Sequence, residues 1–443
     1  MVNPPRAVRA IAERLEAAGF ETWCVGGAVR DALLGHPHLD WDLATAATPD
    51  QVRKLFRRTI PVGLDFGTVG VLDDLGVMHE VTTFRRDVQT DGRHAVVEFG
   101  ASLEDDLARR DFTINAIAVS PSTGDIRDPF GGQADLERKL VRAVGAPDER
   151  MREDRLRALR AIRFAGRLGF AIEDETWRAI VRSAPHLPRL SRERVKQELE
   201  KTVEQVACPS RALALWRESG ALGSLVPVLE GQDDVAFASA DYVPAPGRTR
   251  RPERVDARRL HRILSLFLGL DATRVRATLH DLRFSNADVR TMAKLAEYWT
   301  ALFESVSTAL TESAPDDATI RRWAATTGRT QLAAFLRLAE ARWDARRARG
   351  ASAPSPAHAH SVYRRALRIA YRDPIELADL AVDGEDLQRE GIARGPALGK
   401  ILRLLLESVV EEPARNTRDQ LIDRAKNLAP DVERGIGDVT RQG

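Results

Sequence analysis

Two aspartates with one residue between them, Asp40 and Asp42, lie in a short segment that also contains two adjacent glycines. On an extended strand, residues two apart point to the same face, with Cα atoms roughly 6.6 Å apart. Two carboxylates placed in this way can hold two divalent cations about 3.5–4 Å apart, the spacing used for in-line phosphoryl displacement. Because an Asp-x-Asp pattern is very short, a solvated strand face explains most isolated examples, and its meaning depends on the neighbouring residues.

The residues before this pair predict a strand, a tight turn and a short helix. Thr22-Trp23-Cys24-Val25 is typical of a buried strand, Gly26-Gly27 of a tight turn and residues 28–34 of a helix. Such a turn presents free backbone N–H groups and the positive end of the helix dipole, which suit a triphosphate. Arg30 lies in the first helical turn, where the dipole disfavours a cation. A bound polyanion would remove that conflict, although Gly26-Gly27 alone also fits an ordinary strand-to-helix turn.

Further carboxylates and arginines follow in the same part of the chain. Glu80, in the segment HEVTTFR, is the best candidate for a third metal-binding carboxylate, and a surface strand glutamate is the alternative. Arg109 and Arg110 are adjacent, and adjacent side chains point in different directions on a regular element, so we expect only one of them to face a nucleotide. Asp111 follows them and precedes an apolar run, where it could also cap the next element.

One predicted helix, residues 153–168, carries charged residues at every third position. Asp154, Arg157, Arg160 and Arg163 span about 13.5 Å along its axis. A solvated basic face of an amphipathic helix is the simplest explanation. The single acid in this pattern suggests a second explanation, which is recognition of a base. Cytosine and adenine present a ring-nitrogen acceptor beside an amino donor, whereas guanine and uracil present the reverse. An Arg donor paired with an Asp acceptor therefore suits C and A, and each mismatched buried polar group costs roughly 1–3 kcal/mol.

Five segments in a fixed order give the chain a family resemblance. The glycine pair, Arg30-Asp31, Gly35 and the Asp-x-Asp pair resemble the first motif of the class II tRNA nucleotidyltransferases and bacterial poly(A) polymerases, a branch of the polymerase β superfamily. The likeness continues, and is strong over residues 20–205. The other four segments are RRDFTINA (residues 109–116), DPFGGQADLERKLVRAVG (128–145), EDRLRALRAIRFAGRLGF (153–170) and SRERVKQELEKT (191–202).

The resemblance implies template-independent addition of C and A to the 3′ end of tRNA, from CTP and ATP, with release of pyrophosphate. Asp40 and Asp42 would bind the catalytic Mg²⁺ pair, and Glu80 would be a third catalytic carboxylate. The residues that would surround the nucleotide are Gly26, Gly27, Arg30, Arg110, Asp111, Asn115, Asp154, Arg157, Arg160 and Arg163.

Particular roles within that set also follow from the resemblance. Arg110 would contact the nucleotide, and Asp111 and Asn115 would reach the ribose or brace the site. Asp154 and Arg157 would act as a protein template for the incoming base. The two later arginines of the same helix would then meet phosphates.

The predicted fold class is α+β, with a small mixed sheet at the N-terminus and helices after it. Residues 69–72 and 77–84 flank a turn and predict a hairpin, whereas strand signals are weak from about residue 133 onward. The resemblance implies four domains and a linker. We expect a catalytic nucleotidyltransferase head (1–140), a neck that recognises the base (141–205), a body (206–345), a linker (346–361) and a tRNA-binding tail (362–443).

Composition limits the class of protein. The 443 residues include 67 basic and 65 acidic side chains, so a nucleic-acid surface must come from local clustering of arginine and lysine. The two cysteines, Cys24 and Cys208, are far apart, which argues against a disulfide or a zinc cluster and favours a reducing compartment. No apolar run reaches 18 residues, so we expect a cytoplasmic protein without a membrane span. The expected partner is tRNA, bound at its 3′ end and elbow, and no obligate protein partner is evident.

Several alternatives remain open at this stage. The same head occurs in enzymes that add only A or only CC and in poly(A) polymerases, although residues 85–108 supply a flexible loop that CC-only enzymes typically lack. A catalytically dead RNA-binding protein is a different class, and the paired carboxylates argue against it. His280-Asp281 resembles the metal pair of a phosphohydrolase, but a plain helical segment explains it better because no companion motif is present.

Overall fold

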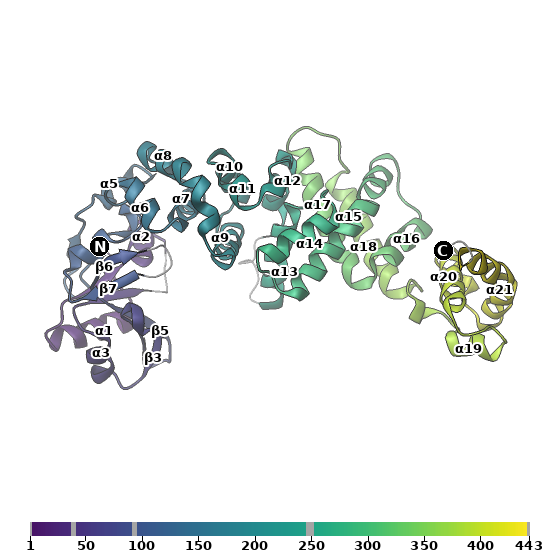
Figure 1. Cartoon of the computed structure of the whole chain (residues 1–443), viewed down its shortest axis with the longest axis horizontal. Coiled ribbons are helices and arrows are strands. Elements are labelled where there is room, and N and C mark those ends of the chain that lie inside the picture. The colour runs from purple at the N-terminus through teal and green to yellow at the C-terminus, as the bar shows by residue number, and fades with distance from the viewer. Residues whose placement is uncertain (1, 37–40, 91–94, 245–251, 441–443) are drawn as a thin grey trace. The chain divides into compact units, whose positions relative to one another are not determined.

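The computed structural model describes the chain except residues 1, 37–40, 91–94, 245–251 and 441–443. The chain forms two compact units, Met1–Glu230 and Gly231–Gly443 (Figure 1). The first unit contains a mixed sheet followed by helices, and the second is helical, which confirms the predicted α+β class. No helix in the described part of the chain is long and apolar enough to cross a membrane.

The main sheet of the first unit is mixed because one central pair of strands is parallel. Strands β2 and β5 pair in parallel, and the other neighbours are antiparallel. In spatial order the seven strands are β3 (Thr59–Gly63), β4 (Thr68–Leu72), β5 (Met78–Thr83), β2 (Asp42–Thr45), β1 (Thr22–Val25), β8 (Ala118–Val119) and β9 (Ile126–Arg127). Two smaller pairs are β6 (Arg85–Thr90) with β7 (Ala95–Phe99), and β10 (Leu140–Val141) with β11 (Ala171–Ile172).

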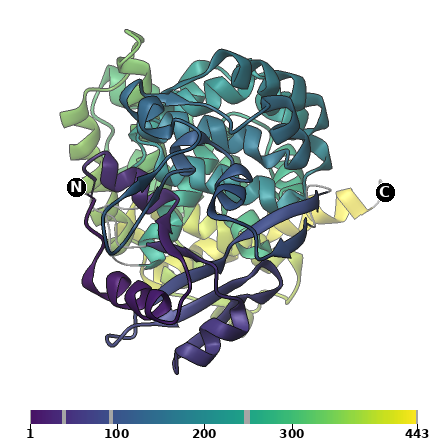
Figure 2. The same cartoon turned by 90° about the vertical axis from the view of Figure 1, so that its left-hand side faces the viewer.

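Helices pack on both sides of this sheet. Helix α1 buries Val8, Ile11 and Leu15, and the chain turns away at Gly19, whose positive φ of 87° suits glycine. Helices α1 and α3 contact each other and neighbouring strands, so they cover the same face (Figure 2). Val25 and Ala44 belong to a separate apolar cluster with leucines of α4. The helices of this unit are α1 (Arg6–Ala17), α2 (Gly27–Leu33), α3 (Pro49–Leu55), α4 (Leu103–Ala108), α5 (Gly132–Glu137), α6 (Pro147–Glu153), α7 (Leu156–Leu168), α8 (Asp174–Ser183), α9 (Arg192–Gln205), α10 (Pro209–Glu218) and α11 (Ala221–Leu225), with short 3₁₀ helices η1 (Leu64–Phe66), η2 (Thr113–Asn115), η3 (Ala184–Arg189) and η4 (Pro227–Leu229).

The second unit contains a helical body and a terminal cluster with an apolar core of its own. In the body, α12 packs on α17, α14 on α15, and α18 on both α16 and α17. The terminal core runs from Val382 to Val432 and joins α19, α20 and α21. The elements are α12 (Asp234–Tyr242), α13 (Pro252–Ser265), α14 (Ala272–Asp281), α15 (Asn286–Glu312), α16 (Asp317–Thr327), α17 (Arg329–Arg347), α18 (Pro356–Arg372), η6 (Leu377–Asp379), α19 (Gly384–Arg389), α20 (Pro396–Glu411), η7 (Pro413–Arg415) and α21 (Arg418–Thr440).

The predicted helix over residues 153–168 is wrong at its start. Helix α6 ends at Glu153 and α7 begins at Leu156, and Asp154 between them is extended, with φ −145° and ψ 105°. The Asp154 carboxylate accepts the backbone N–H of Leu156 at 3.0 Å, which is how short acidic side chains start a helix. Asp154 therefore lies before the helix that carries the three arginines.

The structure adds detail to the predicted domain division. Helix α10 packs on α7 and α9, with Gly166 allowing close approach to Val206 and Ala212, so the first compact unit continues beyond residue 205, the expected end of the neck, to Glu230. The expected linker over residues 346–361 is helical at both ends and irregular over residues 348–355. Helix α17 continues to Arg347, and α18 starts at Pro356 because Ser355 caps it and proline fits the first helical position.

Two smaller expectations also differ from the structure. Strands β10 and β11 pair beyond residue 133, where we expected only helices. Helix α18 belongs to the packing of the body rather than to the tail. His280 and Asp281 end the body helix α14, as the plain helical interpretation predicts.

Candidate active site

A cavity of about 660 Å³ opens in the first unit, between the end of the sheet and helices α7 and α9. Every predicted site residue that the structure describes lines it. These are Gly26, Gly27, Arg30, Asp42, Glu80, Arg110, Asp111, Asn115, Asp154, Arg157, Arg160 and Arg163. Asp40 lies outside the described residues. Sequence reasoning therefore selected residues from five separate segments that the fold brings to one place.

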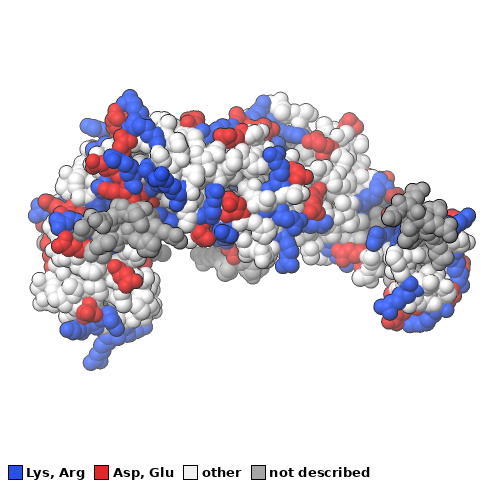
Figure 3. Space-filling model, in the orientation of Figure 1, with Lys and Arg blue, Asp and Glu red and all other residues white. Residues whose placement is uncertain are grey.

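The cavity is much more basic than the chain as a whole. Nine arginines and one lysine line it, against four acidic residues. On the face of the molecule shown in Figure 3, basic and acidic side chains are interspersed, as expected for a chain of near-zero net charge. Positive charge is thus concentrated where a polyanion such as a triphosphate would bind.

Two carboxylates lie level with each other on adjacent central strands. Asp42 opens β2 and Glu80 lies on β5, and the parallel register pairs Leu43 with Val81, one residue after each. The predicted strand of Glu80 is therefore next to that of the aspartate pair. Both side chains are half-buried and line the cavity. Among the residues that the structure describes, no three His, Cys, Asp or Glu side chains form a metal-binding group.

The glycine turn lies directly against these groups. Gly26 has φ 78°, a conformation that side chains disfavour. A Cβ atom on Gly26 would lie 3.1 Å from Arg110 Nη1 and 3.7 Å from Asp42 Oδ2. Glycine at this position therefore allows an arginine and a carboxylate to approach the turn closely.

Arg30, for which we expected a bound polyanion to offset the helix dipole, also has an acidic partner on its own helix. Its guanidinium is 98% buried and pairs with Asp31 Oδ1 at 2.7 Å. It also donates to Asn115 Oδ1 at 2.6 Å, and Asp31 Oδ2 accepts from Arg167 at 2.9 Å. Arg30 thus ties α2 to η2 and, through Asp31, to α7.

Arg109 and Arg110 both line the cavity, although we expected only one of them to face it. Their guanidiniums converge on Asp106, at 2.6 and 2.9 Å, and Asp106 is fully buried in α4. The two arginines lower the pKa of Asp106 although burial acts in the opposite direction. Sequence reasoning missed Asp106, but its i, i+3 and i, i+4 spacing to the two arginines is a usable signal.

Asp111 braces the site from the loop after α4. Its Oδ1 accepts from the backbone N–H of Phe112 and from Asn115 Nδ2, both at 2.9 Å. Its Oδ2 accepts from Arg160 Nε at 2.8 Å and Nη2 at 2.6 Å. Burial opposes ionisation, but Arg160 and Asn115 hold the pKa of Asp111 at about 2. This carboxylate therefore links η2 to α7.

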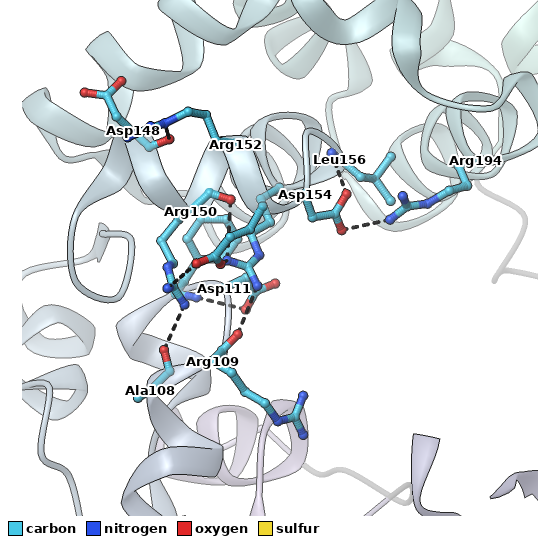
Figure 4. A network of polar contacts seen from close by, with 12 residues as sticks. Ala108, Arg109, Asp111, Asp148, Arg150, Arg152, Asp154, Leu156 and Arg194 are labelled. Carbon is cyan, nitrogen blue, oxygen red and sulfur yellow. Dashed lines mark hydrogen bonds and ion pairs between the residues drawn. The ribbon is translucent and has the colours of Figure 1, made fainter. Parts of the chain in front are cut away.

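Asp154 and Arg157 are held by neighbours at the start of α7, and Figure 4 shows the Asp154 carboxylate facing Arg194. Asp154 Oδ2 accepts from Arg194 of α9 at 2.8 Å, while Oδ1 accepts from Leu156 N–H. Arg157 donates to Glu153 Oε2 at 2.8 Å and to the carbonyl of Arg109 at 3.0 Å. Both side chains line the cavity, with the acceptor on one residue and the donor on the other.

The later arginines of α7 are engaged in ion pairs. Arg160 forms the ion pair with Asp111 described above. Arg163 forms an ion pair with the buried Glu198 of α9 and donates a hydrogen bond to Gln205 at 3.0 Å. The ring centroid of Phe164, which follows Arg163 in the chain, lies 4.6–5.4 Å from the guanidinium carbons of Arg30, Arg160 and Arg163. Glu198, in the segment SRERVKQELEKT, was missed because its partner is 35 residues away.

Known proteins resemble this chain along most of its length. Residues 22–142 match the family model "Poly A polymerase head domain", residues 169–232 match "Probable RNA and SrmB-binding site of polymerase A", and residues 258–425 match tRNA nucleotidyltransferase domain 2. The CCA-adding enzyme of Geobacillus kaustophilus is 44% identical over 57% of this chain, and the alignment spans about three fifths (62%) of that relative's length. The CCA-adding enzyme of Limosilactobacillus fermentum is 34% identical over 95% of this chain and 96% of its own.

A solved structure agrees with the sequence comparison. The crystal structure of the Bacillus stearothermophilus CCA-adding enzyme in complex with CTP is 31% identical, with a TM-score of 0.73, and covers 97% of this chain and 98% of that one. The motifs, the fold and a relative aligned over nearly the whole length lead to one assignment. The chain belongs to the family of CCA-adding enzymes, the tRNA nucleotidyltransferases with a poly(A) polymerase head.

Proposed function

We propose that this protein adds C and A nucleotides to the 3′ end of tRNA without a nucleic-acid template, using CTP and ATP and releasing pyrophosphate. One observation carries the proposal. A single basic cavity holds a level pair of carboxylates, Asp42 and Glu80, together with a separate acceptor and donor, Asp154 and Arg157. The first pair suits nucleotidyl transfer, and the second suits the shared edge of cytosine and adenine.

The carboxylates fit a divalent cation with oxygen ligands. Asp42 and Glu80 are half-buried, level in register and exposed to the cavity, and carboxylate oxygens are the ligands that Mg²⁺ prefers. Asp40, two residues before Asp42, would complete the set. When bound, a pair of Mg²⁺ ions would stabilise the charge on the entering and leaving oxygens. The basic groups beside the Gly26 turn, Arg110 first among them, would hold the triphosphate in line with the RNA hydroxyl.

Base selection would depend on side chains that are already fixed in place. Arg194 and the Leu156 N–H orient the Asp154 carboxylate, and Glu153 with the Arg109 carbonyl orients Arg157. Fixed donors and acceptors discriminate more strongly than mobile ones because a mismatched base leaves them unsatisfied. C and A would satisfy this pair, whereas U and G would present donor and acceptor in the wrong order.

The wider assignments extend this proposal to the rest of the chain. Residues 1–140 would be the catalytic head and residues 141–205 the neck that recognises the base. The helical body and tail would bind the tRNA, including its elbow, by shape and phosphate contacts. The enzyme would work in the cytoplasm.

The test uses tRNA transcripts that end before CCA, after the first C, or after CC, each incubated with one labelled nucleotide at a time. We expect CTP alone to extend the first two transcripts and ATP alone to extend the third. Extension of only the third would identify an A-adding enzyme, and extension of only the first two a CC-adding enzyme. Long A tails on unrelated RNA would identify a poly(A) polymerase and refute the proposal.

A further inference from the structure

An aromatic ring stands exposed on the wall of the cavity. Phe66 ends the short helix η1, between β3 and β4, and 45% of it is exposed. Phenylalanine is among the residue types most often buried, and this exposed ring lines the same cavity as the other site residues. Gly67 follows with φ 81° and precedes β4, which begins at Thr68.

The order of the strands places Phe66 on one side of the carboxylates and the nucleotide groups on the other. The sheet runs β4, β5, β2, β1, so Glu80 and Asp42 occupy the middle strands. The Gly26 turn follows β1, on the side of α2 and α7. Phe66 precedes β4, on the opposite side, and lines the same cavity.

The geometry of nucleotidyl transfer assigns these two sides to different substrates. Entering and leaving oxygens lie roughly in line at phosphorus. With the triphosphate beside the Gly26 turn, pyrophosphate leaves on the β1 side. The hydroxyl of the RNA must then approach from the β4 side, past Asp42 and Glu80, where Phe66 lies.

We propose that Phe66 is the platform on which the base of the RNA's 3′-terminal nucleotide stacks. Arg85 supports it, because its guanidinium carbon lies 5.6 Å from the ring centroid and its Nη1 donates to the Phe66 carbonyl at 2.5 Å. A base that stacks on an aromatic ring next to a guanidinium is bound with little dependence on its identity. The hydroxyls of Thr68 and Thr82, 3.0 Å apart, line the cavity beside this platform.

This inference rests on the proposed function, and the reaction explains why stacking is suitable. The terminal nucleotide changes after each addition, so a site that read its edge by hydrogen bonds would reject some of the intermediates. The incoming nucleotide has its own donor and acceptor at Asp154 and Arg157, on the other side of the cavity. Phe66 therefore holds the RNA end rather than the NTP.

The experiment measures steady-state extension of tRNA ending before CCA by wild type, Phe66→Ala, Phe66→Leu and Phe66→Trp. Leu64→Ala is the matched control, since Leu64 lies on the same short helix, is 36% exposed and is not part of the cavity wall. We expect Phe66→Ala to raise the KM for tRNA about tenfold, within the range of one lost stacking contact. The KM for CTP should stay within about twofold, Phe66→Trp should restore the KM for tRNA, and the control should match wild type.

Three results would overturn the platform. These are an unchanged KM for tRNA in Phe66→Ala, a rise in the KM for CTP instead, or full restoration by Phe66→Leu, which would mean that any apolar side chain suffices. The activity of the wild-type protein distinguishes failure of the proposed function from failure of the stacking platform. A wild-type protein that extends no tRNA would refute the proposed function and the platform with it, whereas an active wild type with an unaffected Phe66→Ala would refute the platform alone.

Discussion

Replacing Asp111 with asparagine should weaken the contact between η2 and α7. The carboxylate accepts four hydrogen bonds at 2.6–2.9 Å, two of them from Arg160, and is 91% buried. Asparagine has the same shape but replaces one acceptor oxygen with a donor, so two of the four donors lose their partner in either orientation. Breaking one side of a buried ion pair costs about 3–5 kcal/mol. A free-energy loss of about 1.4 kcal/mol lowers protection against hydrogen exchange about tenfold. The backbone amides of α7 should therefore lose roughly two to three and a half orders of magnitude of this protection.

Hydrogen exchange measured by mass spectrometry reports the stability of individual peptides within the full-length protein. Peptides from α7 should exchange faster in Asp111→Asn, while peptides from α15 in the second unit serve as an internal reference. The control is Asp148→Asn, because Asp148 and Arg182 form the same kind of two-bond pair, at 2.9 and 2.8 Å, but on the surface. Exposed pairs contribute little, so the control should change protection less than about fivefold. Equal protection of α7 in both variants would refute the assignment.

The same pair predicts a pH dependence. The pKa of Asp111 falls from its ordinary value of 3.8 to about 2 in the folded protein. A depressed pKa stabilises the fold above the unfolded pKa, and this stabilisation is lost as pH falls from about 4 through 2. The difference corresponds to about 2.5 kcal/mol. In wild type, α7 should therefore lose stability as pH falls from about 4 to 2. In Asp111→Asn this pH-dependent loss should be smaller, because asparagine does not titrate.

Three further predictions test the proposed chemistry and RNA binding. Asp42→Asn should slow nucleotide addition at least about 10³-fold in single-turnover assays while tRNA affinity stays within about threefold; a rate within tenfold of wild type would contradict the metal assignment. Arg157→Ala should relax discrimination against UTP and GTP about tenfold in a four-nucleotide competition, because the base loses one donor; unchanged selectivity would place the template elsewhere. Arg364, Arg368 and Arg372 are exposed on α18 at steps of about 6 Å, so replacing all three with alanine should reduce the salt slope of tRNA affinity by about 2; an identical slope would exclude this surface.

Much of the head could be predicted from local patterns. The buried strand before Gly26, the hairpin of β4 and β5 and the helix that ends near Gly19 follow from apolar spacing and turn residues. Motif order then identified 12 of the 26 residues that line the cavity. These features are local in sequence, which is why a single chain reveals them.

The long-range partners could not be predicted in the same way. Arg163 pairs with a glutamate 35 residues away, and Arg160 with an aspartate 49 residues away. A regular stripe of arginines indicates a charged face, but only the packing of α7 against α9 and η2 decides which acids neutralise it. The break at Asp154 was missed for a related reason, since an aspartate that caps a helix also fits the periodicity of a continuous one.

Arginines of the cavity differ in whether they have an acidic partner of their own or share one with another arginine. Arg160 and Arg163 each have a carboxylate of their own, so their charges are balanced; Arg160 joins α7 to the loop after α4, and Arg163 joins α7 to α9. Arg109 and Arg110, in contrast, share the single acid Asp106, which leaves one positive charge in excess. Because Arg110 also approaches the Gly26 turn, that excess lies where the triphosphate is proposed to bind. Neutralisation in the folded chain, rather than the count of arginines in the sequence, thus decides which of them is available to a polyanion.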